Sequence, residues 1–276
     1  MDNIKPNSER LFLPVKYDVI FRLFFADERN NDELVSLLKS VLRLPWDEYE
    51  SIEIADPNLL PEYIGDKYAI IDIKLHTKSH KTIQIEVQLQ VQKNMMKRII
   101  FYNAKLITEQ MGSGDRYDKI QNVVSIIITD EDLIADSQKY HHRFTHSDLE
   151  TNVELTDLSE IHTIELSKLP ISTDGTALYD WAKFIAAETY EELDMCAKMN
   201  PQVSRAVVKL RELSADERAR DMYERRLKGW RDFESSMDDA EYKGRTIVAR
   251  NLLKRNRPID EIMEDTGLSR IEIESL

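Results

Sequence analysis

The chain has 276 residues with 38 basic and 51 acidic side chains, which gives a formal net charge of −13. This balance excludes a polybasic, histone-like protein. Hydrophobic residues make up 42% and charged residues 32%, a composition typical of a folded, helix-rich globular protein. The single cysteine, Cys196, excludes an internal disulfide framework and a cysteine-based zinc site, and it favours a reducing compartment.

No stretch has the apolar length of a membrane helix, and the first residues lack the apolar core of a signal peptide, so we expect a cytoplasmic protein. Residues 129–199 hold most of the acidic excess, with 5 basic and 16 acidic side chains. Between Glu86 and Glu109 there is no acidic residue, and the basic residues there are Lys93, Lys97, Arg98 and Lys105. A local basic surface is therefore compatible with the low net charge, although a solvated helix face explains the same residues.

The first half of the chain shows clear periodicity. The apolar spacing predicts helices at 17–25 and 31–42, with a short strand at 51–55. Residues 66–76 and 82–92 alternate strictly between apolar and polar side chains, which predicts two half-buried strands joined as a hairpin. The helical spacing returns at 93–111, and a continuously apolar strand is predicted at 122–129.

The second half is mostly polar and helical. His141, His142 and His146 fall in a predicted polar loop, where the sequence signals no further ligand for a zinc site. The later elements are a strand at 162–166, a helix at 176–194, helices from 200 onward, and capping boxes at Ser214–Glu217 and Ser269–Glu272. We therefore divide the chain into a domain at 1–199 and a charged helical region at 200–276. That region ends in a helix-turn-helix-like segment at 259–276, whose acidic second helix suits packing more than DNA reading.

Two carboxylates face each other in the predicted hairpin. If its turn is centred near Ser79, Asp72 lies directly across from Glu86, with about 4.5–5.5 Å between their Cβ atoms. Such a pair needs a cation, either Lys74 or another basic side chain, or a bound metal ion. Carboxylates hold Mg²⁺ in many proteins, and the metal can activate water for phosphodiester cleavage. A polar hairpin face in water, with Lys74 neutralising both acids, explains the same residues.

The order of the elements resembles the αβββαβ core of the PD-(D/E)xK nuclease superfamily. More closely, the chain resembles the Rpn-type recombination-promoting nucleases, also described as PD-(D/E)XK nuclease family transposases. The resemblance rests on LPVKYDVIFRLFF near the start, DKYAIIDIK at 66–74, IQIEVQ at 83–88, and Arg98 followed by Tyr102. It extends through NVVSIIIT and EIHTIELSKL to the helical tail, and so it covers essentially the whole chain.

The resemblance implies an α/β, restriction-endonuclease-like fold with a helical C-terminal extension. It also implies an endodeoxyribonuclease that uses Mg²⁺, Mn²⁺ or another divalent cation to cut DNA in recombination or transposon mobility. Asp72 becomes the principal metal ligand and Glu86 the second. The backbone carbonyl of Val87 and the carboxylate of Asp18 are further candidate ligands, although Asp18 also suits the start of a helix.

Gln88 stands where the wider superfamily has a lysine. A glutamine can orient the attacking water, but it brings no positive charge to it. We expect nucleic-acid contacts from Lys74, Lys93, Lys97, Arg98 and Tyr102. Lys93 or Lys97 can supply the missing charge. Arg98 and Tyr102, one helical turn apart, can contact a phosphate, or the arginine stem can pack on the tyrosine ring.

Two other functions stay open. One is a non-catalytic relative of the same fold that binds nucleic acid or protein. The other is a nuclease directed at RNA or at the host genome, as in a toxin or defence system. The sequence also leaves open whether the chain forms a homo-oligomer.

Overall fold

The computed structural model describes residues 12–54 and 73–276. The chain forms two compact units: one extends to Arg220 and contains a mixed sheet with helices, and Asp221–Leu276 is helical. Within the described ranges, no helix combines the length and the apolar character needed to cross a membrane.

A six-stranded sheet is the framework of the first unit, with the order β1-β2-β3-β4-β6-β5. The strands are β1 (Glu53–Ile54), β2 (Ile73–His76), β3 (Thr82–Gln88), β4 (Val123–Thr129), β5 (His141–Ser147) and β6 (Glu154–Glu165). β3, β4 and β6 run parallel, and the other pairings are antiparallel. β4 is buried along its whole length, as expected for a central strand covered on both faces.

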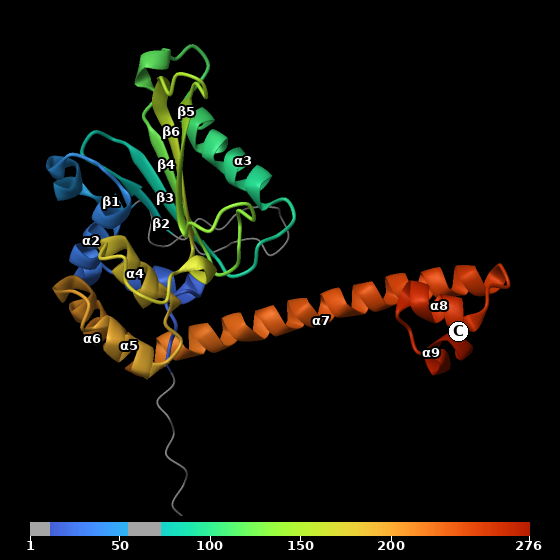
Figure 1. Ribbon diagram of the computed structural model, residues 1–276. Helices are drawn as coiled ribbons and strands as arrows, with labels where there is room; N and C mark the ends of the chain where they lie inside the picture. The colour runs from blue at the N-terminus through green and yellow to red at the C-terminus, as the bar shows by residue number, and fades with distance from the viewer. Residues whose placement is uncertain (1–11, 55–72) are drawn as a thin grey trace, which may run out of the picture. The chain divides into compact units, whose positions relative to one another are not determined.

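Helices cover the two faces of the sheet. Those of the first unit are α1 (Asp18–Phe25), α2 (Asn31–Val41), α3 (Met95–Thr108), α4 (Ala177–Ala186), α5 (Tyr190–Cys196) and α6 (Pro201–Ala215). α3 packs on one face through Met95 and Ile99, which contact Ile127 of β4. Figure 1 shows α3 on one side of the sheet and α2 and α4 on the other. Phe25 of α1 and Trp181 of α4 are fully buried, and their ring centroids lie 5.9 Å apart.

The predicted hairpin is confirmed over its described part. Ile73 pairs with Ile85 and Lys74 with Gln84, so the antiparallel ladder is centred on Ser79 as expected. The alternation arises because the apolar positions of both strands must reach the same buried face. The first part of the predicted strand at 66–76 lies outside the described residues, and Asp72 belongs to that part.

The order of elements from α2 to β4 is helix, three strands, helix and strand, which is the predicted αβββαβ core. α1, α2, β1, α3 and β4 each fall within the ranges that the sequence predicts. These elements carry strong apolar periodicity, and this periodicity is the most reliable local signal of secondary structure.

Three predictions after residue 129 are wrong. The polar loop expected around the three histidines is strand β5, which pairs with β6 and has a β-bulge between Phe144 and Ser147. The short strand expected at 162–166 is the end of β6, a strand of 12 residues. The single helix expected at 176–194 is broken into α4 and α5, because Thr189 forms a capping box that starts a new helix.

The capping box expected at Ser214–Glu217 is also wrong. Ser214 lies inside α6, and the carboxylate of Asp216 instead accepts a hydrogen bond from the backbone N–H of Ala219 at 2.8 Å. α6 packs against α2, α4 and α5. The first unit therefore includes α6 and ends at residue 220, whereas the sequence analysis placed a boundary at residue 199.

The second unit takes most of α7 (Glu217–Lys254), followed by α8 (Ile259–Thr266) and α9 (Arg270–Glu274). Its small core includes Ala249, Ile262 and Ile273. α8 ends at Gly267, which adopts a left-handed conformation with φ of 68°, and the predicted capping box at Ser269 opens α9. The expected pair of short helices at the end of the chain is confirmed.

Candidate functional site

Glu86 is the centre of the candidate site. It lies in β3, where its side chain is only 2% exposed. Its carboxylate is directed to the face of the sheet that carries α3, since it contacts Arg98 of that helix. A buried carboxylate in a central strand is costly unless charged or hydrogen-bonded groups satisfy it. Its neighbours therefore determine what Glu86 can do.

Two side chains bind the same oxygen of Glu86. The Nη2 atom of Arg98 donates to Oε1 at 2.6 Å, and the Nε2 atom of Gln88 donates to it at 2.8 Å. Gln88 reaches Glu86 because residues two apart on a strand share a face. In the described ranges, no residue donates a hydrogen bond to Oε2 of Glu86, and the buried Nε of Arg98 has no partner. One carboxylate oxygen and one guanidinium nitrogen thus have no hydrogen-bond partner in the described part of the chain.

Burial and the cation act against each other on Glu86. Removal of the carboxylate from water raises its pKa, whereas the charge of Arg98 and the bonds from Arg98 and Gln88 lower it, and burial dominates. Glu86 therefore holds a proton more tightly than an exposed glutamate. A divalent cation would compete with that proton for the carboxylate.

The remaining predicted ligands have separate locations. Val87 belongs to the buried part of β3. Asp18 is the first residue of α1, and its Oδ1 accepts a hydrogen bond from the backbone N–H of Val19 at 2.8 Å. Asp72 is outside the described residues. The part of the chain that the structure describes contains no group of three acidic, histidine or cysteine side chains that could hold a metal ion.

The predicted nucleic-acid contacts differ in exposure. Lys93 and Lys97 are exposed, Lys74 is half-buried and Arg98 is engaged with Glu86. Tyr102 is 7% exposed, and its ring meets that of Phe101 edge-on, with 5.3 Å between the centroids. The two exposed lysines are thus the described basic side chains near the site that are most open to solvent.

The sequence analysis missed two polar networks beside the site. Lys16, 7% exposed, forms ion pairs with Asp130 at 2.6 Å and with Glu188. Asp130 follows β4 directly, and its backbone N–H donates to the carbonyl of Gln88 at 3.2 Å. The partners of Lys16 lie more than a hundred residues away in the sequence, so no local spacing indicates the cluster.

The second network joins α3 to the sheet. The Nδ2 atom of Asn103 donates to Oγ of Ser125 at 2.8 Å, and Oγ of Ser159 donates to Oδ1 of Asn103 at 2.6 Å. All three residues are at least 94% buried. Buried hydrogen bonds of this kind require one arrangement of the two elements, so the network fixes the position of α3, and with it Arg98.

The αβββαβ core with a buried glutamate and a glutamine on β3 defines a nuclease-type α/β fold. The family model of the PD-(D/E)XK nuclease family transposases matches residues 15–240, and the chain belongs to this family. No curated protein and no solved structure matches the chain. Membership supports a nuclease or transposase role with DNA as substrate, and nucleases of the PD-(D/E)XK group generally use divalent metal ions.

The described donors fit a hard cation. Oε2 of Glu86 is a carboxylate oxygen of the kind that Mg²⁺ and Mn²⁺ prefer, and it accepts no hydrogen bond from the residues at 12–54 and 73–276. Arg98 neutralises the other oxygen, so a cation at Oε2 would give Glu86 two positive neighbours. That arrangement favours the ionised carboxylate, which metal binding requires.

Proposed function

We propose that the protein is a Mg²⁺-dependent endodeoxyribonuclease that acts in the cytoplasm in DNA recombination or transposon mobility. Asp72 and Glu86 would hold the metal ion, with the carbonyl of Val87 and the carboxylate of Asp18 as further ligands. The observation that carries the proposal is the buried Glu86, whose Oε1 is bound by Gln88 and Arg98 while Oε2 accepts no hydrogen bond from the described residues.

Different residues of the chain would have different roles in the hydrolysis. Gln88 is held by its bond to Glu86, so its amide oxygen can orient the attacking water. The water oxygen forms a bond to phosphorus as the bond to the leaving oxygen breaks, and no covalent enzyme intermediate forms. A bound divalent ion lowers the pKa of water and neutralises the charge that develops on the phosphate. The exposed Lys93 and Lys97 would contact phosphates, and Arg98, whose Nε is buried, would hold the carboxylate of Glu86 in place.

The decisive experiment is cleavage of supercoiled plasmid by the purified chain with Mg²⁺, with Mn²⁺ and with EDTA. Glu86→Gln and Asp72→Asn should abolish nicking and linearisation. The matched control is Glu109→Gln, at the exposed residue directly after α3, which should cut like the unmodified chain. Cleavage that survives EDTA or Glu86→Gln would refute the proposed site. Parallel digestion of single-stranded DNA, duplex DNA and RNA identifies the substrate.

A non-catalytic binding protein is the second candidate function, and the ion pair between Arg98 and Glu86 favours it. A cation supplied by the chain itself satisfies the acid without a metal ion. This alternative predicts DNA retention on a gel in EDTA, no cleavage with any divalent ion, and no effect of Mg²⁺ on the stability of the chain. Cleavage that requires both acids would exclude it.

A further inference from the structure

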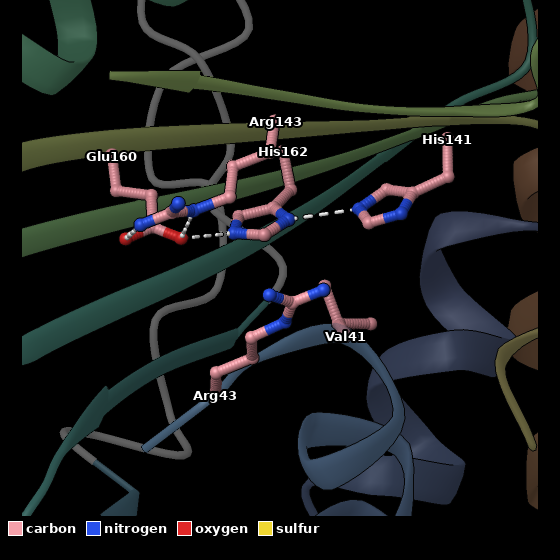
Figure 2. A pocket seen from close by; sticks show the side chains of 6 residues that line it. All are labelled: Val41, Arg43, His141, Arg143, Glu160 and His162. Carbon is pink, nitrogen blue, oxygen red and sulfur yellow. Dashed lines mark hydrogen bonds and ion pairs between the residues drawn. The ribbon is translucent and has the colours of Figure 1, made fainter. Parts of the chain in front are cut away.

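A polar cavity lies on the face of the sheet opposite to Glu86. Ile161 of β6 packs with the α3 cluster, so its neighbours Glu160 and His162 point to the other face. The cavity has a volume of about 410 Å³, within the range of small-molecule sites. Figure 2 shows the residues that line it, which are Val41, Arg43, His141, Arg143, Glu160 and His162.

A chain of hydrogen bonds organises one wall of the cavity. Nε2 of the buried His162 lies 2.6 Å from Oε1 of Glu160, and its Nδ1 lies 2.8 Å from Nε2 of His141. Arg143 holds the same glutamate with two bonds, from Nε at 2.6 Å and from Nη2 at 3.1 Å. Burial acts to raise the pKa of Glu160, but the hydrogen bonds and charges of His162 and Arg143 together outweigh it and lower the pKa to about 2. Glu160 stays ionised throughout the physiological range and neutralises Arg143.

Arg43 has no such counter-charge. It follows the end of α2, its side chain is exposed, and it forms no hydrogen bond or ion pair with the residues that the structure describes. In Figure 2 its guanidinium is turned toward the ring of His162, and no interaction joins the two. Because Glu160 offsets Arg143, Arg43 is the cation of this wall that has no counter-charge among the described residues.

His141, which also lines the cavity, has a lowered pKa. Burial first, then the charges of His162, His142 and Arg43, lower it to about 4. His162 of β6 and Arg43 after α2 line the same cavity as His141, whereas His142, the next residue of β5, is directed to the other face and meets Ser137 and Glu165. The Nδ1 atom of His141 has no partner in the described ranges. Burial therefore accounts for most of the lowered pKa, and the charge of Arg43 beside the ring favours an anion in the cavity.

We propose that this cavity binds the phosphate monoester group of a small molecule or of a nucleic-acid strand end. Arg43 provides the charged fork that matches a phosphate. His141 provides a second contact through Nδ1, and Glu160 with Arg143 fixes His162 behind it. Neither Glu86 nor a metal ion is required, so the site is separate from the proposed nuclease site. A duplex is too broad for a cavity of this size, whereas a single phosphate group or mononucleotide fits.

A bound dianion would bring negative charge next to His141. That charge favours the protonated ring, so binding takes up a proton and strengthens as the pH falls. Each histidine ring in the hydrogen-bonded series His141–His162–Glu160 has two nitrogens. Nε2 of His141 is bound to His162, and its Nδ1 has no described partner, so Nδ1 can carry the added proton. The phosphate then receives hydrogen bonds from two elements of the unit.

Calorimetric titration of the full chain in EDTA tests the site, with Glu86→Gln present throughout so that nuclease activity plays no part. Inorganic phosphate is the first probe. A nucleoside 5′-monophosphate and a short DNA strand with or without a 5′-phosphate distinguish the two sources of the group. Arg43→Ala should weaken phosphate binding about tenfold or more, the effect of losing a charge-assisted contact. The matched control, Arg116→Ala, removes another exposed arginine charge, one that does not line the cavity, and should change the affinity less than about twofold.

Two results would overturn the proposal. One is the absence of saturable binding of every probe at millimolar concentration, and the other is equal binding by Arg43→Ala and Arg116→Ala. Sulfate is a dianion that does not titrate between pH 5 and 8. Its binding therefore measures the contribution of His141 to the pH dependence. Its affinity should rise as the pH falls in the parent chain and rise less in His141→Gln. A flat profile in the parent chain would refute the proton uptake.

Discussion

The removal of Arg98 would leave Glu86 as a buried acid without its cation. Glu86 is 2% exposed and the side chain of Arg98 is 27% exposed, with 2.6 Å between the paired atoms. The loss of one partner from a fully buried pair costs about 3–5 kcal/mol. Because Arg98 is partly solvated, we expect a smaller loss for Arg98→Met, about 2–3 kcal/mol of the free energy of unfolding with Glu86 ionised.

This loss should depend on pH in a defined direction. Burial holds the pKa of Glu86 in the folded chain above the ordinary 4.5, so the folded state binds the proton more tightly than the unfolded state. The penalty of the buried charge is absent below about pH 4.5 and appears as the pH rises through the raised pKa. Without Arg98 that penalty grows, so Arg98→Met should be nearly neutral at pH 4 and most destabilising at pH 8.

Urea denaturation followed by tryptophan fluorescence measures the effect, since Trp181 is fully buried in the first unit. The design compares Arg98→Met, Glu86→Gln and the double variant at both pH values. Lys97→Met, an exposed neighbour on α3, is the matched control. The double variant should recover most of the loss at pH 8. An equal loss at pH 4 and pH 8, or additive single effects, would refute the reasoning.

Three further substitutions test other parts of the structure. Lys16→Met removes the shared cation of Asp130 and Glu188 and should cost about 2 kcal/mol in urea denaturation, whereas an unchanged midpoint would mean that the pair is as weak as an exposed one. Asn103→Leu removes the acceptor of the buried Ser159 hydroxyl and one of the two amide donors to Ser125, and it should cost about 2 kcal/mol in the same assay; a cost near zero would contradict a structural role for the network. Gly267→Ala forces a Cβ into a conformation with φ of 68° and should cost about 1 kcal/mol, seen as faster proteolysis of the second unit; unchanged proteolysis would contradict this.

Much of the first half of the fold could be predicted from the sequence. The strict alternation in the hairpin determines which side chains reach the core, and a shift by one residue would bury its polar face. The register centred on Ser79 agrees with that constraint and with the short polar stretch between the two strands. Glu86 and Gln88 share a face because they are two residues apart on one strand. The family follows from the same blocks, since their order and spacing occur together.

The second half could be predicted less well, because its strands depend on tertiary pairing. β5 consists of His141 to Ser147, which have no apolar period, and it is a strand because β6 supplies its hydrogen bonds. The ion pair between Arg98 and Glu86 joins a helix to a strand, and the sequence analysis left open which basic side chain meets the acid. The cluster around Lys16 and the cavity behind β6 assemble residues from distant segments, which no motif can reveal.

The edges of the six-stranded sheet also bear on how the protein avoids aggregation. An edge strand presents unpaired backbone groups to which another chain can add, and proteins commonly protect such edges with short strands, charges or bulges. β1 is only two residues long, and β5 carries His141, Arg143 and a bulge after Phe144. The side chains that line the cavity therefore also make β5 a poor template for strand addition, so replacing them all with apolar residues would cost the protein its resistance to forming fibrils as well as its anion site.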